Sequence, residues 1–410
     1  MSFKIATNGV SNGNVGMLVH GYYPRDVRVR REAEALVEEG YNVKVICLRA
    51  PEEQRNKRGH AQDIVNGVYI YRLPLCRKRG GFFRYLFEYI VLVILGAWKL
   101  LSLHLKSPFH IVHIHNMPDF LILAGLITRW MGAKLVLDIH DPMMELYATT
   151  SRLGHNRWVL KALNWQQKIS CRLANRIVSV NETMRENLTN KGVQEEKIFI
   201  IHNFPDTKYL PIKNYNSWPR HEDGLFLLYA GTVTEHYRLD LAVEALAQAS
   251  KNLPWIKLRI LGEGNDLERV LKLANKLGIR DYIELLNPVN VEKLKDLMKD
   301  IDIGISCHQG GLFGDLQLTC KVLDYLTQGI PVISSRTKTL IRYIPEEAVF
   351  YFDPESAEDM AQQIMKMWNR PDLVRKKMEY AQKLIAQYTW QRERFKLIEF
   401  YRGLLNNKQI

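Results

Sequence analysis

Residues 303–333 read IGISCHQGGLFGDLQLTCKVLDYLTQGIPVI, which is a strand, a loop, a helix and a second strand in succession. The apolar ends of this stretch predict two buried strands. Between them, the pattern predicts a helix that begins at Thr319 as its N-cap and ends at Gly329. A strand, a helix and a second strand in this order predict one unit of a parallel α/β sheet.

The loop of this unit carries Gly310, Gly311 and Gly314 and leaves the carboxyl end of a strand, where parallel sheets bind ligands. The helix N-terminus presents free N–H groups that suit a phosphate. Lys321 lies in the first turn, where a cation is unfavourable for the helix dipole, so we expect it to meet an anion. Asp324 lies one turn further on the same face and is placed to accept hydrogen bonds from hydroxyl groups.

The segment K-V-L-D-Y-L-T-Q-G-I-P-V-I, residues 321–333, resembles a motif of family 4 glycosyltransferases. The segments Y-Y-P-R-D-V-R, H-N-M-P-D-F, L-D-I-H-D and Y-A-G-T resemble other loops of that family, so the resemblance runs from residue 16 to about residue 405. These enzymes are retaining, use nucleotide sugars and have two Rossmann-like domains, an architecture called GT-B. The segment also fits an ordinary βαβ unit of any α/β enzyme, so its structural context has to agree.

The predicted fold is α/β, with two Rossmann-like domains whose parallel sheets face each other across a cleft. We predict an N-terminal acceptor-side domain over 1–206, a linker over 207–224, a nucleotide-sugar-binding domain over 225–387 and a helix over 388–410 that crosses back to the first domain. A length of 410 residues is comfortable for two domains. The linker loses periodicity and gains prolines, asparagines and charge.

The composition restricts the partners and the compartment. A net charge of +13 favours an anionic partner, but no nucleic-acid-binding motif accompanies it, so nucleic acid is not a predicted partner. Five cysteines without C-x-x-C spacing indicate a reducing compartment and argue against a disulfide framework or a zinc site. The polar N-terminus predicts no signal peptide, and because no run of 18 uncharged apolar residues occurs, no spanning helix is expected.

The family resemblance implies a donor site in the second domain. It assigns Lys321 and Arg238 to the diphosphate, Asp324 to the ribose hydroxyls and Asp315 to the donor sugar. The implied donor-binding residues are Gly231, Thr232, Arg238, Gly262, Pro288, Thr319, Lys321 and Asp324.

The chain departs from the family pattern at this site. Many members have an arginine and a lysine where this chain has Thr232 and Tyr237. Many also have two glutamates eight residues apart, where this chain has Leu316 and Asp324, and its nearest carboxylate is Asp315, nine residues before Asp324. The departures put the donor and the catalytic rate in question. They also keep a non-catalytic member of the family open.

His140 follows the expected strand 134–139, at the same edge as the other loops, and in the family this histidine faces the transferring sugar. The catalytic candidates are therefore His140, Asp315 and Lys321. The alternative is that a structural pair of His140 and Asp141 caps the next helix. The acceptor-side candidates are Gly21, Tyr22, His115, Asn116 and Asp141.

No metal site and no cofactor are predicted. His113 and His115 alternate on a strand, but a pair with no third ligand nearby is weak support for a metal. At the diphosphate, positive charge from Lys321, Arg238 and the helix N-terminus at Thr319 is expected to replace Mg²⁺. The nucleotide sugar is then a co-substrate.

Residues 76–106 have the most unusual composition, because a basic cluster precedes an apolar helix. The uncharged core, 89–98, is ten residues long, which is too short to span a bilayer and long enough to lie in its interface. The alternative is a crossover helix buried against the sheet, which explains the apolar stripe but not the adjacent R-K-R. The predicted contacts with an anionic membrane surface are Arg77, Lys78, Arg79, Phe83 and Arg84.

Together these inferences predict a retaining glycosyltransferase that moves a sugar from a UDP- or GDP-sugar to a saccharide or lipid-linked acceptor in polysaccharide biosynthesis. The expected location is cytoplasmic and peripheral, on the inner face of the plasma membrane. Two alternatives are a non-catalytic GT-B relic that acts as a membrane-surface partner protein, and a nucleotide-sugar epimerase of the same architecture. A retaining hydrolase would need two carboxylates about 5–5.5 Å apart, for which Asp315 and Glu145 are remote candidates.

Overall fold

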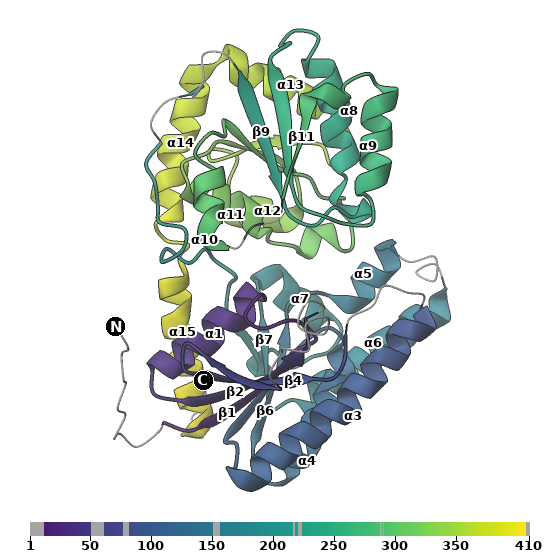
Figure 1. The fold of residues 1–410 in the computed structure, drawn as a ribbon, viewed down its shortest axis with the longest axis vertical. Helices are drawn as coiled ribbons and strands as arrows, with labels where there is room; N and C mark the ends of the chain where they lie inside the picture. Colours follow the sequence, from purple (N-terminus) through teal and green to yellow (C-terminus); the bar gives the residue numbers. More distant parts are fainter. Residues whose placement is uncertain are drawn as a thin grey trace. The chain divides into compact units, whose positions relative to one another are not determined.

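The computed structural model describes residues 12–50, 61–76, 82–150, 156–215, 218–219, 224–287, 289 and 291–406. Figure 1 shows two compact units, each a sheet covered by helices. The N-terminal unit comprises Met1–Met144, Asn156–His202 and Arg394–Ile410, and the C-terminal unit comprises Glu145–His155 and Asn203–Glu393. The prediction of two α/β domains with parallel sheets is confirmed.

The sheet of the N-terminal unit has eight strands in the order β3-β4-β2-β1-β5-β6-β7-β8. All neighbours pair in parallel except β3 and β4. The strands are β1 (Asn14–Leu18), β2 (Asn42–Leu48), β3 (Gln62–Val65), β4 (Val68–Leu73), β5 (Ile111–His115), β6 (Lys134–Ile139), β7 (Arg176–Ser179) and β8 (Ile198–Ile200). The helices are α1 (Val27–Glu38), α3 (Phe82–Lys106), η1 (Asp119–Gly125), α4 (Leu126–Trp130), α6 (Arg157–Leu173), α7 (Glu182–Asn190) and η3 (Glu195–Lys197), and α5 (Met143–Thr150) begins in this unit.

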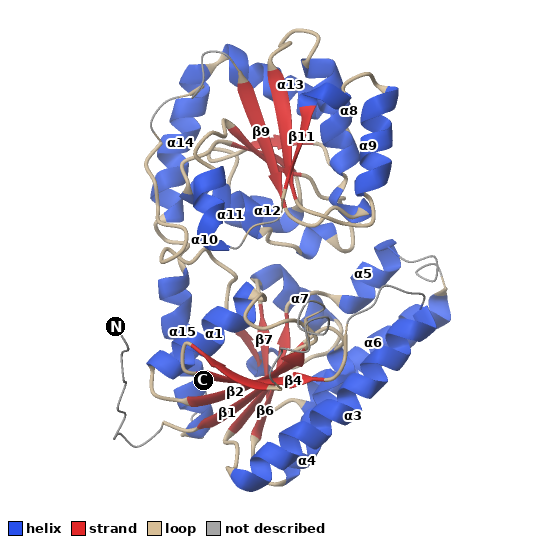
Figure 2. Cartoon of the chain, viewed as in Figure 1, coloured by secondary structure: helices blue, strands red, loops and turns tan. Residues whose placement is uncertain are grey.

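The sheet of the C-terminal unit has six strands in the order β11-β10-β9-β12-β13-β14, all paired in parallel. Figure 2 shows helices on both sides of this sheet. The strands are β9 (Leu225–Ala230), β10 (Ile256–Leu261), β11 (Ile283–Leu286), β12 (Ile303–Ser306), β13 (Val332–Ser335) and β14 (Phe350–Phe352). The helices are η4 (Glu235–Tyr237), α8 (Leu239–Ala249), α9 (Leu267–Lys276), η5 (Arg280–Tyr282), α10 (Val291–Leu297), η6 (Gly314–Leu316), α11 (Cys320–Thr327), α12 (Lys338–Tyr343), α13 (Ala357–Asn369) and α14 (Pro371–Ile385).

Each sheet contains a point at which the strand order reverses. In the N-terminal unit β1 lies between β2 and β5, and in the C-terminal unit β9 lies between β10 and β12. Loops that leave the carboxyl ends of two strands at such a point diverge, and open α/β sheets bind their ligands in the crevice between them. The loops after β1 and β5 in one unit, and after β9 and β12 in the other, are therefore the places to look for a site.

The antiparallel strand β3 was absent from the sequence prediction. It pairs with β4 through a hairpin whose turn is Asn66-Gly67, with φ angles of 50° and 81°. Asparagine followed by glycine is a strong short-range signal for such a turn, because both tolerate positive φ. The pair Asn66-Gly67 is therefore the local sequence signal for this antiparallel strand.

The last helix, α15 (Trp390–Leu405), begins in the C-terminal unit and ends in the N-terminal unit. The N–H of Trp390 donates to the carbonyl of Pro205 at 2.9 Å, within the C-terminal unit. Further along, Phe400 stacks on Phe199 with ring centroids 4.9 Å apart, and both belong to the N-terminal unit. Helix α15 therefore supplies part of the core of the N-terminal unit.

Helix α3 presents an exposed apolar stripe. Phe87, Ile94 and Trp98 are 67%, 62% and 66% exposed, whereas Leu92 and Leu100 on the same helix are fully buried. The stripe that the sequence assigned to a membrane surface is therefore an outward face. The alternative, that this stripe is buried against the sheet, is wrong for these three residues.

Among the described residues, one helical segment, Arg84–Lys106 of α3, is long and apolar enough to cross a membrane by length and composition alone. The prediction that no such segment exists is wrong by this measure, because it considered only runs without charge, and α3 carries Glu88 and Lys99 among its apolar residues. The helix packs against η1, α4 and β2 of its own unit. That packing favours the interpretation of α3 as a surface helix of the N-terminal unit over that of a membrane-crossing helix.

Gly264 lets two loops of the C-terminal unit touch through their backbones. A Cβ at this position would lie 1.7 Å from the carbonyl oxygen of Val233. The N–H of Val233 in turn donates to the carbonyl of Glu263 at 3.0 Å. No flexible side chain is available to move aside, so a larger residue would displace the backbone itself.

We predict that Gly264→Ala lowers the free energy of unfolding by about 2–3 kcal/mol, the size expected of a strained backbone. Gly310→Ala is the matched control, because the nearest contact of a Cβ there is 3.7 Å away. Urea unfolding followed by circular dichroism measures both variants. Equal stability of the two would contradict the packing described for Gly264.

Candidate active site

The predicted donor site of the C-terminal unit is built around Lys321, in the first turn of α11. Tyr325 fixes this helix against β9, because its hydroxyl donates to the carbonyl of Leu228 and accepts from the N–H of Ala230, both at 2.9 Å. The side chain of Lys321 then lies on the glycine that follows β9, since a Cβ on Gly231 would meet its Cε at 2.4 Å. Two predicted donor-binding residues, Gly231 and Lys321, are therefore in contact.

Two tyrosine rings surround the ammonium group of Lys321. Its Nζ lies 3.9 Å from the ring centroid of Tyr237 and 4.9 Å from that of Tyr229, and aromatic faces attract a cation. Burial lowers the pKa of Lys321 to about 8. A nearby anion would favour the charged ammonium. Tyr237, one of the departures from the family pattern, thus supports the cation that the site retains.

Sequence reasoning missed two histidines beside this lysine. Ring centroids of His236 and Tyr237 are 4.3 Å apart, and those of Tyr237 and His308 are 5.0 Å apart. Burial, with the charge of Lys321, lowers the pKa of His236 to about 4 and that of His308 well below its usual value. Both imidazoles are therefore neutral at pH 7. The available signal was their position in the loops that leave β9 and β12.

Two other predicted donor contacts already have partners within the C-terminal unit. Arg238 donates from Nε to Asp240 at 3.2 Å and from Nη1 to Glu355 at 2.7 Å. Oδ1 of Asp315 accepts the N–H of Lys338 at 3.0 Å, at the start of α12. Of the two cations predicted for the diphosphate, Lys321 is therefore the better placed.

Thr319 occupies the N-cap position of α11, but its side chain forms no capping hydrogen bond, which corrects the role predicted for it. That side chain consequently does not compete for the N–H groups that we expect to face a phosphate. Asp324 is half-buried one turn further along the helix, and Thr232 is exposed in the loop after β9. Gly262 allows close approach, because its Cβ would lie 1.9 Å from a carbonyl oxygen in that loop.

In the N-terminal unit, Asn116 joins the loops that follow β5 and β6. Its Nδ2 donates to a carboxylate oxygen of Asp119 and to the carbonyl of Asp141, both at 2.8 Å. Its Oδ1 accepts the N–H of His140 at 2.9 Å. The predicted residues Asn116, His140 and Asp141 are thus brought together, and the amide of Asn116 is used to hold the loops.

His140, the catalytic candidate, is 5% exposed and shares a carboxylate with its neighbour. Its Nε2 lies 3.1 Å from Oδ2 of Asp138 and 3.1 Å from Nδ1 of His115. Burial lowers the pKa of His140 to about 3, although Asp138 opposes the shift, so the imidazole is neutral at pH 7. The alternative of a pair with Asp141 is wrong, because the carboxylate partner of His140 is Asp138.

The structure also removes the reason for setting aside His113 and His115 as metal ligands. Nε2 of His113 lies 3.4 Å from Oδ2 of Asp138, and Nδ1 of His115 lies 3.1 Å from the same oxygen. Glu32 of α1 completes the group, since one ligand atom from each of the four residues lies within 4.8 Å of the others. Burial, with the charge of Asp138, raises the pKa of Glu32 to about 8. Sequence spacing alone did not reveal these two carboxylates.

The loop after β1 carries Gly21 and Tyr22, the remaining acceptor-side candidates, both half-buried. The residue before them, His20, contacts α3: its Nε2 lies 2.7 Å from Oε1 of Glu88, and its ring packs edge-on against Tyr89 with centroids 5.1 Å apart. The first turns of α3 therefore reach the carboxyl edge of the sheet. The exposed apolar stripe of that helix begins beside the candidate acceptor loop.

Several predicted contacts cannot be placed within the part of the chain that the structure describes. Arg77, Lys78, Arg79 and Pro288 lie outside the described residues, as does the side chain of Phe83. Arg84, the remaining predicted membrane contact, is exposed at the start of α3.

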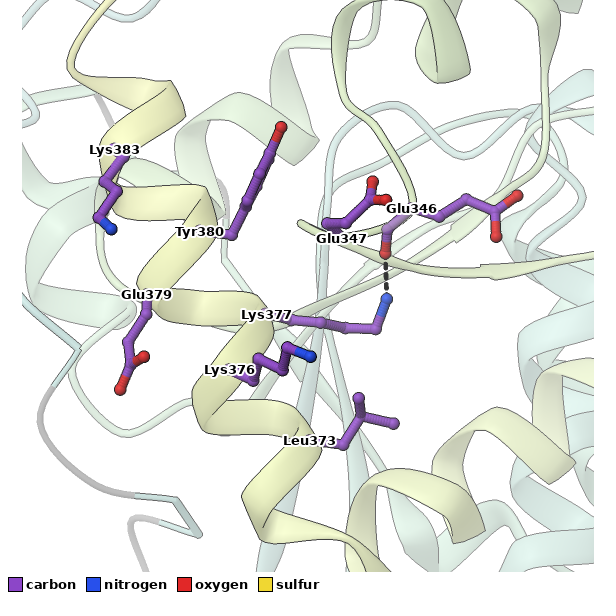
Figure 3. A pocket seen from close by; sticks show the side chains of 8 residues that line it. All are labelled: Glu346, Glu347, Leu373, Lys376, Lys377, Glu379, Tyr380 and Lys383. Carbon is purple, nitrogen blue, oxygen red and sulfur yellow. Dashed lines mark hydrogen bonds between the residues drawn. The ribbon is translucent and has the colours of Figure 1, made fainter.

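A pocket of about 430 Å³ in the C-terminal unit shares no residue with the Lys321 surroundings. Figure 3 shows it beside α14, where Nζ of Lys377 donates to the carbonyls of Glu346 and Val349. Its charges are mixed in sign, so it has no evident preference for an anion or a cation. The pocket is lined by Glu346, Glu347, Leu373, Lys376, Lys377, Glu379, Tyr380 and Lys383.

Comparison with known families agrees with this geometry. Residues 26–209 match the family Glycosyltransferase Family 4, and residues 213–384 match the family Glycosyl transferases group 1. The chain is a glycosyltransferase with the GT-B architecture. Within that class it belongs to the enzymes of the family 4 type, as the sequence motifs predicted.

The individual relatives are distant. An uncharacterized glycosyltransferase of Methanocaldococcus jannaschii is 21% identical, over 86% of this chain and 89% of the relative. The gpi3 subunit of the phosphatidylinositol N-acetylglucosaminyltransferase of Schizosaccharomyces pombe is also 21% identical, over 73% of this chain and 60% of the relative.

Among solved structures, sucrose-phosphate synthase of Thermosynechococcus elongatus has a TM-score of 0.75 at 16% identity, covering 97% of this chain and 100% of that one. HepE of Anabaena, in complex with UDP-glucose, has a TM-score of 0.71 at 12% identity, covering 95% and 100%. At these identities the likeness shows a shared fold.

We predict that Asn116→Ala destabilises the N-terminal unit by about 2–4 kcal/mol, because it leaves buried polar groups without partners. Asn190→Ala is the control, since Asn190 is an exposed asparagine of the same unit, in α7, and such changes usually stay within about 0.5 kcal/mol. Urea unfolding followed by circular dichroism compares the two proteins. An Asn116→Ala protein as stable as the control would show that these hydrogen bonds do not hold the loops.

Proposed function

We propose that the protein transfers a sugar from a nucleotide sugar, a UDP- or GDP-sugar, with retention of anomeric configuration. The observation that carries the proposal is the position of Lys321. It lies in the first turn of α11, beside the loop after β9, at the strand reversal where such sheets bind ligands. The structure of HepE, which shares the fold, contains UDP-glucose.

The chemistry assigned to this site is charge stabilisation. The bond from the anomeric carbon to the diphosphate oxygen breaks, and a new bond forms from that carbon to an acceptor hydroxyl oxygen. The hydroxyl proton passes to an oxygen of the departing diphosphate, on the same face of the sugar. Lys321 and the N–H groups at the start of α11 stabilise the negative charge of the leaving group, so the transfer needs no metal ion at the diphosphate.

The other assignments follow the family resemblance. We assign Asp324 to the ribose hydroxyls and His140 to the transferring sugar. The neutral imidazole of His140 contacts Asp138, and the backbone N–H of His140 donates to Oδ1 of Asn116, so we assign it a positioning role at the sugar and not a charged one. Arg238 and Asp315 have weaker claims to direct donor contact, because each already has partners within the C-terminal unit.

We also propose that the enzyme acts at the inner face of a membrane on a lipid-linked acceptor. The exposed stripe of α3 supports this, because aromatic and aliphatic side chains at helical spacing suit the interface of a bilayer. The first turns of α3 contact the loop after β1 through the pair of His20 and Glu88. A lipid-linked acceptor held at the surface would therefore meet the candidate acceptor loop.

The alternatives have less support. The family match favours a transferase over an epimerase. A non-catalytic relic would retain the fold but would not require a lysine at the diphosphate position. Nucleotide release from a panel of UDP- and GDP-sugars, with a bacterial lipid extract as acceptor, distinguishes turnover from binding alone.

We predict that Lys321→Met lowers kcat by on the order of 10²-fold or more, because the ammonium is needed most as the diphosphate leaves. Lys338→Met is the control: Lys338 is an exposed lysine of the same unit, at the start of α12. Steady-state kinetics with the best donor of the panel measures both variants. Turnover by Lys321→Met at the rate of the control would overturn the assignment of this lysine.

A binding measurement on the wild-type protein tests whether a metal acts at the diphosphate. Isothermal titration of the nucleotide into the wild type should give the same affinity with EDTA and with Mn²⁺. If Mn²⁺ raised the affinity for the nucleotide tenfold or more, a metal and not Lys321 would supply the positive charge.

For the membrane surface, we predict that Phe87→Glu weakens binding to anionic vesicles at least tenfold, since burying one such side chain is worth about 1.5–3 kcal/mol. Phe395→Glu is the matched control, because Phe395, on α15 of the same unit, is likewise 67% exposed. Co-sedimentation with phosphatidylglycerol vesicles measures both, and salt should weaken the wild type. Equal pelleting of the two variants would show that α3 does not contact the bilayer.

A further inference from the structure

We propose that Glu32, His113, His115 and Asp138, here called the histidine–carboxylate cluster, bind one divalent metal ion that accepts nitrogen and oxygen ligands, of the zinc type. The four residues come from α1, β5 and β6 of the N-terminal unit. This site is separate from the diphosphate chemistry assigned to Lys321 in the C-terminal unit. The proposal therefore does not depend on the proposed reaction.

The first argument is distance. One ligand atom from each residue lies within 4.8 Å of the other three. Zinc binds nitrogen and oxygen at about 2.0–2.2 Å in a tetrahedral arrangement, so two ligand atoms of one ion are about 3.4 Å apart. Small rotations of side chains would close the group around a single ion.

The second argument is that the cluster contains buried polar atoms without hydrogen-bond partners. They are Nε2 of His113, Nε2 of His115, Oδ1 of Asp138 and Oε2 of Glu32. The residues are between 0% and 4% exposed. Buried polar atoms are nearly always satisfied, so four together call for an unseen partner such as an ion or water.

The third argument comes from the groups behind the ligands. A metal-bound histidine usually donates a hydrogen bond from its second ring nitrogen to an oxygen, which fixes the orientation of the ring. His113 does this, with Nδ1 2.6 Å from the hydroxyl of Tyr401, and His115 does so with Nδ1 3.1 Å from Oδ2 of Asp138. In both rings the nitrogen that remains, Nε2, forms no hydrogen bond, although in His113 it lies 3.4 Å from Oδ2 of Asp138, itself a proposed ligand.

The fourth argument is charge. Among the described residues, no lysine or arginine forms a salt bridge with Glu32 or Asp138. Arg28 and Arg31 act on Glu32 electrostatically without forming a salt bridge with it. Two buried carboxylates without a direct cationic partner are costly, because each must be desolvated and they repel each other. A divalent cation would neutralise both. The ion would join α1 to β5 and β6, directly beneath the loop that carries His140.

The test uses the full-length chain without a polyhistidine tag, dialysed first against a chelator and then against Zn²⁺. Elemental analysis should find one zinc per chain in the wild type. Glu32→Gln keeps the size of the side chain and should lower zinc affinity at least tenfold. Glu34→Gln is the matched control, because Glu34 is also buried on α1 but pairs with Arg30 at 2.9 Å, and this variant should bind as the wild type does.

X-ray absorption of the zinc-loaded wild type supplies a measurement that does not depend on a variant. It should show nitrogen and oxygen neighbours at about 2.0–2.1 Å and no sulfur. Sulfur neighbours would place the ion at a cysteine, and zinc uptake by Glu32→Gln equal to that of Glu34→Gln would place it elsewhere. Either result overturns the proposal. A wild-type protein that retains no zinc overturns it as well, since the cluster would then be a hydrogen-bonded group filled by water. These results would not change the outcome expected for Lys321→Met, so the two proposals can fail separately.

Discussion

A parallel sheet brings the carboxyl ends of all its strands to one edge, and the loops that leave this edge can meet only where backbones approach closely. In the C-terminal unit, Gly231, Gly262 and Gly264 permit that approach, and Lys321 takes the space that a side chain on Gly231 would fill. In the N-terminal unit, the amide of Asn116 joins two such loops. The shape of each candidate site thus depends on close backbone contacts and hydrogen bonds between the loops of its own unit.

The two units arrange charge in opposite ways. In the C-terminal unit an ammonium group lies among tyrosines and neutral imidazoles, so a ligand that brings negative charge is favoured. In the N-terminal unit two buried carboxylates lie among imidazoles, so a ligand that brings positive charge is favoured. Buried ionisable groups whose pKa values are shifted by their surroundings are typical of sites that bind ions or charged substrates.

Local pattern was sufficient to predict much of the fold and part of the sites. The segment around Lys321 predicted its strand, loop and helix, because apolar periodicity and glycine positions are local properties. The partners of His140 could not be predicted in the same way. Asp138 is only two residues away, but His115 meets His140 through the pairing of β5 with β6. Glu32 in turn meets His115 and Asp138 through the packing of α1, which depends on residues distant in sequence. Arg238 likewise looked available from the sequence, but it pairs with Glu355, over a hundred residues later.

Helix α15 has a consequence for the order in which the protein can be made. Its residues Phe400 and Tyr401 are fully buried in the N-terminal unit, where Tyr401 meets His113. A ribosome synthesises these residues only after the whole C-terminal unit. Domains generally fold as units during synthesis, the N-terminal one first. Here the N-terminal unit remains incomplete until α15 has been synthesised, so nascent chains expose the apolar surface that α15 later covers.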